Sequence, residues 1–108
     1  MSSFKKEATM TNEEIAKQLE SYLVKLNESL KDCNDGILLQ SEAPKIIQET
    51  ISKVKEILPE NSRPYKEFDS EIIKLSLWWK KSKYVDKKDC NKFEQLSNIL
   101  KKVLINYH

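Results

Sequence analysis

The 108-residue chain has the length of a single domain. Its residues are 39% hydrophobic and 33% charged, which is too apolar for a disordered chain and too charged for one that spans a membrane. A single glycine argues against an all-β fold, because such folds need glycine-rich turns. The composition therefore favours a charged, globular, all-α domain.

The formal net charge is only +2, so the chain as a whole has no strong field that would attract nucleic acid. The charge is distributed unevenly, however. Residues 1–76 hold 11 bases and 14 acids, a net −3, whereas residues 77–108 hold eight bases and three acids, a net +5. Arg63 is the only arginine, and lysine makes poor bidentate contacts to phosphate. We expect no nucleic-acid partner.

Cys33 and Cys90 are too few for a disulfide framework and have no CxxC partner. They are interpreted as two reduced thiols of a cytosolic protein. The first residues lack the apolar core of a signal peptide, and no apolar run approaches the ~18 residues of a transmembrane helix. The expected location is cytoplasmic.

Residues 1–10 show no periodicity and are predicted to form a flexible N-terminal tail. Thr11 and Glu14 then fit a capping box that begins a first helix, which should end near Asn34 and Gly36. Its apolar stripe is Ile15, Leu19, Tyr22, Leu23, Leu26 and Leu30.

A second helix is expected from Ser41, as N-cap, to Pro59, with Pro44 tolerated in its first turn. Its apolar stripe is Ala43, Ile46, Ile47, Ile51, Val54, Ile57 and Leu58. A short loop with two prolines follows it.

The third predicted helix carries Tyr65, Phe68, Ile72, Leu75 and Trp79 on one face. Three further apolar residues lie off that face: Ile73, Leu77 and Trp78. Either this helix is central in the domain or it leaves an apolar patch exposed.

A fourth helix should begin at Asp86 as N-cap, with Asp89 near the positive end of its dipole. Val85 and Cys90 are spaced for a hydrophobic staple, which gives Cys90 a structural role. The apolar stripe is Phe93, Leu96, Leu100, Val103, Leu104 and Tyr107. Residues 11–108 are therefore predicted to form a single domain, an all-α, antiparallel, up-down four-helix bundle.

Residue types that support catalysis are scarce. His108 is the only histidine and is the last residue, and the inward positions of the four stripes offer no carboxylate to the core. No phosphate-binding or nucleophile motif is present. We expect no enzyme, no catalytic residues, no cofactor and no metal site.

Lysines gather between the expected end of the third helix and the first turn of the fourth: Lys80, Lys81, Lys83, Lys87, Lys88 and Lys92. They could complement the dipole of the third helix and solvate a turn. Alternatively, they form a surface for an acidic partner or anionic lipid headgroups. Trp78 either packs along a neighbouring helix or is a binding hot spot beside these lysines. Ile73 and Leu77 could cover the loop before the fourth helix or join a docking surface.

The order of these elements resembles the immunity proteins of pediocin-like (class IIa) bacteriocins, of the enterocin A immunity type. The similarity covers about residues 12–104. It is strongest in three segments: residues 68–79 (FDSEIIKLSLWW), 83–86 (KYVD) and 93–100 (FEQLSNIL).

The resemblance implies a cytosolic four-helix bundle that protects a bacteriocin producer without catalysis. The implied partner is the mannose phosphotransferase permease with bound bacteriocin, with possible peripheral contact to the inner face of the membrane. The partner-binding residues carried over are Trp78, Lys80, Lys81, Lys83, Lys87 and Lys88. The alternative is a non-catalytic helical subunit or adaptor of a larger assembly. The wide apolar surface of the predicted third helix supports this alternative.

Overall fold

A computed structural model describes residues 10–108. The predicted tail, residues 1–10, falls outside this part except for Met10, which is half-buried and packs against the core. Four α-helices make up the domain, and no strand forms among the described residues. The all-α prediction is confirmed.

The first two helices follow the sequence pattern closely. Helix α1 spans Asn12–Asn34 and begins with the predicted capping box, in which the Thr11 hydroxyl accepts from the Glu14 amide and the Glu14 carboxylate accepts from the Thr11 amide. Gly36, with a φ of 77°, follows its end. Helix α2 spans Ala43–Ile57, and Glu42 rather than Ser41 is its N-cap residue.

Helix α3 is shorter than predicted. It spans Arg63–Ile72, begins with the Ser62 hydroxyl accepting from the Tyr65 amide, and does not reach Trp79. From residue 73 to residue 86 the chain is non-helical, and we call this segment the strap. The expectation of one long third helix is wrong.

The last helical part begins as a 3-10 turn, η2, over Lys87–Cys90, which continues as α4 over Asn91–Leu104 and a final turn, η3, over Ile105–Tyr107. Asp86 caps η2, accepting from the Lys88 amide. The predicted N-cap is therefore confirmed for the 3-10 turn that leads into α4.

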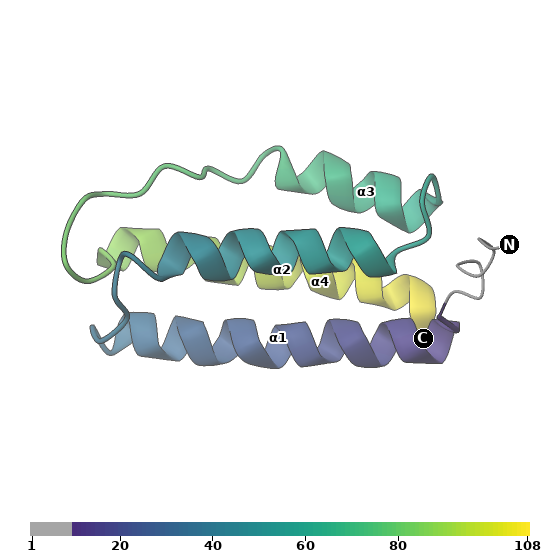
Figure 1. Ribbon diagram of the computed structural model, residues 1–108, viewed down its shortest axis with the longest axis horizontal. Coiled ribbons are helices and arrows are strands. Elements are labelled where there is room, and N and C mark those ends of the chain that lie inside the picture. The colour runs from purple at the N-terminus through teal and green to yellow at the C-terminus, as the bar shows by residue number, and fades with distance from the viewer. Residues whose placement is uncertain (1–9) are drawn as a thin grey trace, which may run out of the picture.

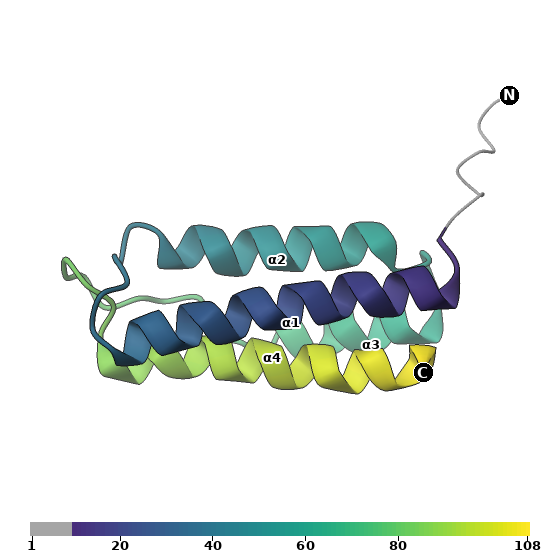
Figure 2. The ribbon, with the colours of Figure 1, turned by 90° about the horizontal axis from the view of Figure 1, so that it is seen from below.

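Figure 1 shows the helices side by side, with α1 and α3 running toward one end and α2 and α4 toward the other. The most extensive contact joins α1 and α4, and α3 lies against α4. Figure 2 shows α4 directly beside α1 over most of its length. The side chains buried at this contact are the predicted stripes, including Leu19 and Leu26 of α1 and Leu96 and Leu100 of α4, each 0% exposed.

The strap runs from the end of α3 to the end of the molecule where α1 stops and α2 begins (Figure 1). There it meets the loop between α1 and α2, where Leu39 and Tyr84 form an antiparallel bridge. The Gln40 amide donates to the Lys83 carbonyl, and the Val85 amide donates to the Leu38 carbonyl, each at 2.9 Å. Two loops that are far apart in sequence are thus joined at one end.

Candidate interaction surface

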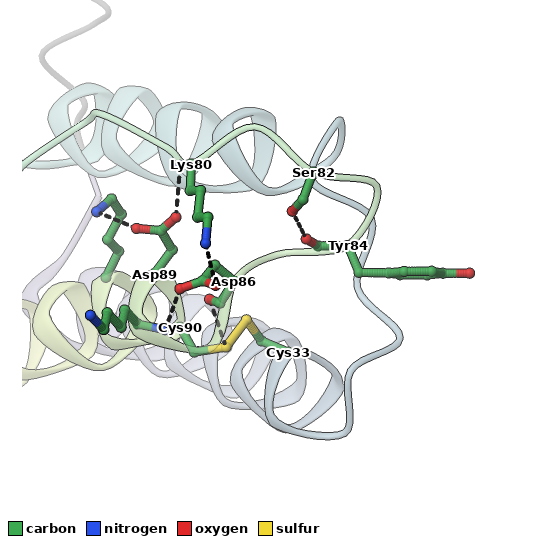
Figure 3. Close-up of a disulfide and its surroundings, with 9 residues drawn as sticks. Cys33, Lys80, Ser82, Tyr84, Asp86, Asp89 and Cys90 are labelled. Atoms are coloured by element: carbon green, nitrogen blue, oxygen red, sulfur yellow. Dashed lines mark hydrogen bonds and ion pairs between the residues drawn. A yellow bond between two sulfur atoms is a disulfide. The ribbon is translucent and has the colours of Figure 1, made fainter.

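A disulfide between Cys33 and Cys90 fixes the same end of the molecule. Their Cα atoms lie 5.7 Å apart, and both residues are buried. The bond joins the last turn of α1 to the end of η2, 57 positions later (Figure 3). The prediction of two reduced thiols is wrong because the fold, and not the sequence spacing, brings the sulfur atoms together. Cys90 therefore has a structural role through this bond, which differs from the packing with Val85 that the sequence pattern predicted.

Asp89 is a buried carboxylate that the sequence analysis did not place in the core. Its Oδ2 accepts from the Lys80 amide of the strap at 2.9 Å, and its Oδ1 lies 3.1 Å from Lys92 Nζ. Asp89 is 7% exposed and Lys92 is 9% exposed, so each charge is compensated in a nearly water-free place. The expectation that no carboxylate enters the core is wrong. The i, i+3 spacing of Asp89 and Lys92 was the available signal.

Trp79 packs on this pair and on the core. Its ring centroid lies 6.1 Å from that of Phe93, and Lys92 Nζ lies 5.2 Å from the Trp79 ring. The prediction that Trp79 packs on the core is confirmed, although Trp79 belongs to the strap and not to a helix. Leu75 and Val85 are also buried.

These contacts are incompatible with a third helix that continues to residue 80. In a helix continued to residue 80, the Lys80 amide would donate to the carbonyl four residues before it and would be lost to Asp89. A buried carboxylate without that donor is costly. In the strap conformation, the Lys80 amide is free to donate to Asp89. Leu75 and Val85 are still buried and Trp79 is half-buried. Tertiary contacts therefore override the local helical pattern.

The predicted site residues are all exposed, but they are not equivalent. Trp78 is 71% exposed, which contradicts the interpretation that it packs along a neighbouring helix. Lys80 Nζ lies 3.6 Å from Asp86 and points toward the start of η2 (Figure 3), so its charge is partly compensated. Lys81 and Lys83 lie on the strap. Lys87 and Lys88 lie on η2.

Because α3 ends at Ile72, Lys80, Lys81 and Lys83 lie well beyond its last turn. The helix dipole acts only within that last turn, so it does not account for Lys80, Lys81 or Lys83. Lys83 instead lies over the Tyr84 ring, 5.6 Å from its centroid, and Tyr84 points away from the helices (Figure 3). The Ser82 hydroxyl donates to the Tyr84 carbonyl. Lys92 differs from the other five lysines because it is buried.

Ile73 and Leu77 do not cover the loop before η2. They line a groove of about 410 Å³ between the strap and α2, together with Ile51 and Ile72. Ile73 is 77% exposed and Leu77 is 49% exposed. The strap therefore presents apolar as well as basic side chains to solvent.

The groups that could support other chemistry lie elsewhere. His108 Nε2 lies 3.5 Å from the Glu20 carboxylate, at the opposite end of the molecule from the disulfide (Figure 1). Burial raises the pKa of the Tyr22 and Tyr107 phenols, and the charge of Glu56 adds to the effect at Tyr22. Within residues 10–108, no cluster of His, Cys, Asp or Glu could hold a metal ion. None of the described helices is long and apolar enough to cross a bilayer.

Comparisons with known proteins identify no relative: no protein-family model matches the chain, and neither does any curated protein or solved structure. The resemblance to bacteriocin immunity proteins rests on the sequence segments alone.

Proposed function

We propose that this chain is an immunity protein for a pediocin-like bacteriocin. In this proposal it protects the producing cell by binding, from the cytosolic side, the mannose permease that a bacteriocin has engaged. It does so without catalysis, as an antiparallel up-down bundle. The alternating directions of the four helices in Figure 1 support that arrangement.

The strap is the observation that carries the proposal. It has no acidic residue from Ile73 to Val85, four lysines and an exposed Trp78. A strap with these features suits a binding role, because Trp is enriched among hot spots of protein interfaces. The Leu39–Tyr84 bridge and the Asp89 contacts hold this segment against the helices.

A protection assay tests the proposal. The chain is expressed in a sensitive Gram-positive strain, which is then challenged with a panel of pediocin-like bacteriocins. We expect survival against one or a few of them. Charge reversal at Lys81 and Lys83 should abolish this protection. The variant keeps Lys80, because Lys80 pairs with Asp86 and its reversal would also disturb the fold.

The matched control reverses two exposed lysines on other helices, Lys25→Glu of α1 and Lys53→Glu of α2. Both double variants are first shown to be folded by circular dichroism and thermal unfolding. Full protection by a folded K81E/K83E protein, or equal loss in the control, would remove the strap from the proposal. Uniform killing by the whole panel, with the protein folded and expressed, would contradict the immunity function itself.

The disulfide makes a second test possible. The cytosol keeps thiols reduced, whereas disulfides persist in oxidising compartments. Action on the cytosolic side therefore requires that the protein protects with Cys33 and Cys90 as thiols. We expect a folded Cys33→Ser/Cys90→Ser variant to protect as well as the natural chain. A folded variant that gives no protection would count against cytosolic action.

The second candidate function is a non-catalytic helical subunit or adaptor of a larger assembly. The groove between α2 and the strap, with Ile73 and Leu77 exposed beside it, favours this candidate. It requires that the purified protein associates with itself or with a partner. A clean monomer in analytical ultracentrifugation would weaken it, whereas a concentration-dependent oligomer that Leu77→Ser disrupts would favour it over immunity.

A further inference from the structure

The strap exposes large apolar side chains in a place where nothing in the fold requires them. Ile73, Leu77 and Trp78 are 77%, 49% and 71% exposed. They follow one another closely along the chain, whereas the inward side chains of the strap are Leu75, Trp79 and Val85. Single exposed apolar residues are normal on protein surfaces, but Ile73 and Leu77 line one groove and Trp78 directly follows Leu77 in the chain, and such grouping marks a contact surface.

Positive charge on the same segment is incompletely compensated. The strap lysines Lys81 and Lys83 make no ion pair within the part of the chain that the structure describes. The nearest acids are already engaged: Asp69 with Lys55 at 2.9 Å, Glu71 with Lys74 at 3.7 Å, and Asp86 with Lys80 at 3.6 Å. Lys87 and Lys88 of η2 extend the uncompensated positive charge beyond the strap.

We infer that the strap docks on the surface of an anionic lipid bilayer. Trp78 and its apolar neighbours would enter the headgroup region, while the lysines contact lipid phosphates. The inference deepens the proposed function by naming lipid as a partner of the same surface, and it rests on that proposal for the choice of the inner leaflet.

The residue types suit a lipid surface beside the protein partner proposed above. Lysine is depleted at protein interfaces, where arginine is enriched, and this chain has a single arginine, which lies outside the strap. Against a bilayer, by contrast, lysine can place its alkyl chain along apolar surface and keep its ammonium among the headgroups. Tryptophan is enriched at the membrane–water interface. Lysines near an anionic surface each contribute about 1 kcal/mol of attraction.

Vesicle binding by tryptophan fluorescence tests the inference. The chain has two tryptophans, so Trp79→Phe leaves Trp78 as the only reporter. We expect its emission to shift to the blue with vesicles of phosphatidylcholine and phosphatidylglycerol, but not with phosphatidylcholine alone. Added salt should weaken the binding, since it screens exposed charges. In this background, Lys81→Gln with Lys83→Gln should weaken binding by about 30-fold, the product of two losses of about 1 kcal/mol.

The control in the same background is Lys17→Gln with Lys25→Gln, which removes the same charge from exposed positions of α1. It should change binding less than threefold if the strap is the contact. Equal weakening by the two pairs would show attraction by net charge and overturn the inference. So would the absence of any shift with anionic vesicles at low salt, which would leave the strap to a protein partner.

The vesicle and protection assays fail independently. Protection without vesicle binding would reject the lipid contact and keep the immunity function. Vesicle binding that depends on Lys81 and Lys83, without protection against any bacteriocin, would support the lipid contact and reject the immunity function.

Discussion

The contact between α1 and α4 and the strap bury their residues by different means. Between α1 and α4, apolar side chains repeat at helical spacing on both helices and meet over a long stretch. The strap buries few side chains and is held by individual links: a disulfide at its η2 end, a two-residue bridge and a buried carboxylate. Many small contributions hold the first region, so no single one decides its structure. A few specific contacts hold the second, so each should have a visible effect.

Removing the disulfide should give the largest effect on the stability of the domain. The bond closes a loop of 57 positions, and the loss of that constraint on the unfolded chain corresponds to about 4 kcal/mol. We expect the free energy of unfolding to fall by about this amount in Cys33→Ser/Cys90→Ser, measured by urea denaturation.

Hydrogen exchange sharpens the same comparison. In the reduced protein, the amides of Lys80 and Val85 should lose protection before those of α1 and α4 do, because only a few contacts hold the strap, whereas α1 and α4 also pack on each other over a long stretch. Uniform loss of protection in both regions would show that the disulfide holds the whole domain and not the strap in particular.

Asp89 should give the next largest effect. Asp89→Ala leaves the Lys80 amide and the nearly buried Lys92 ammonium without their acceptor. We expect a loss of about 3 kcal/mol in the free energy of unfolding. Asp86→Ala is the matched control, since it removes a half-buried cap of η2 and should cost about 1 kcal/mol. Equal losses in the two variants would show that Asp89 acts only as another helix-end acid.

The same contrast explains which parts of the fold could be predicted. Helical periodicity and helix caps depend on residues that are near each other in sequence. The capping box at Thr11, the apolar stripes of α1 and α4, and the end of α2 before Pro59 could therefore be predicted. The non-helical strap was not predictable, because its Lys80 amide is bound by Asp89, which lies 17 residues beyond the end of α3 at Ile72. Nor was the Cys33–Cys90 pair, since no local pattern places the end of η2 beside the end of α1. The lysines of the candidate surface were found from their clustering in the sequence and from the family resemblance, but the pairing of Lys80 with Asp86 and the burial of Lys92 needed the fold.

The two adjacent tryptophans give the smallest and most direct comparison. Trp79 is half-buried on Phe93 and Lys92, whereas Trp78 is 71% exposed. Trp79→Ala should therefore lower the free energy of unfolding by about 2 kcal/mol, less than the loss for a fully buried tryptophan. Trp78→Ala should change it by no more than about 0.5 kcal/mol.

For binding, we expect the opposite order of importance: Trp78 should matter more than Trp79, although the two residues are adjacent. Trp78→Ala should weaken binding at the strap while the protein keeps its stability, which is the property that separates a contact residue from a core residue. The Trp79→Phe protein should keep both its fold and its binding, because a smaller aromatic ring can still pack on Phe93. If Trp78→Ala instead destabilises the protein as much as Trp79→Ala does, Trp78 supports the fold. That outcome would contradict the proposal that Trp78 is the main contact residue on the exposed side of the strap.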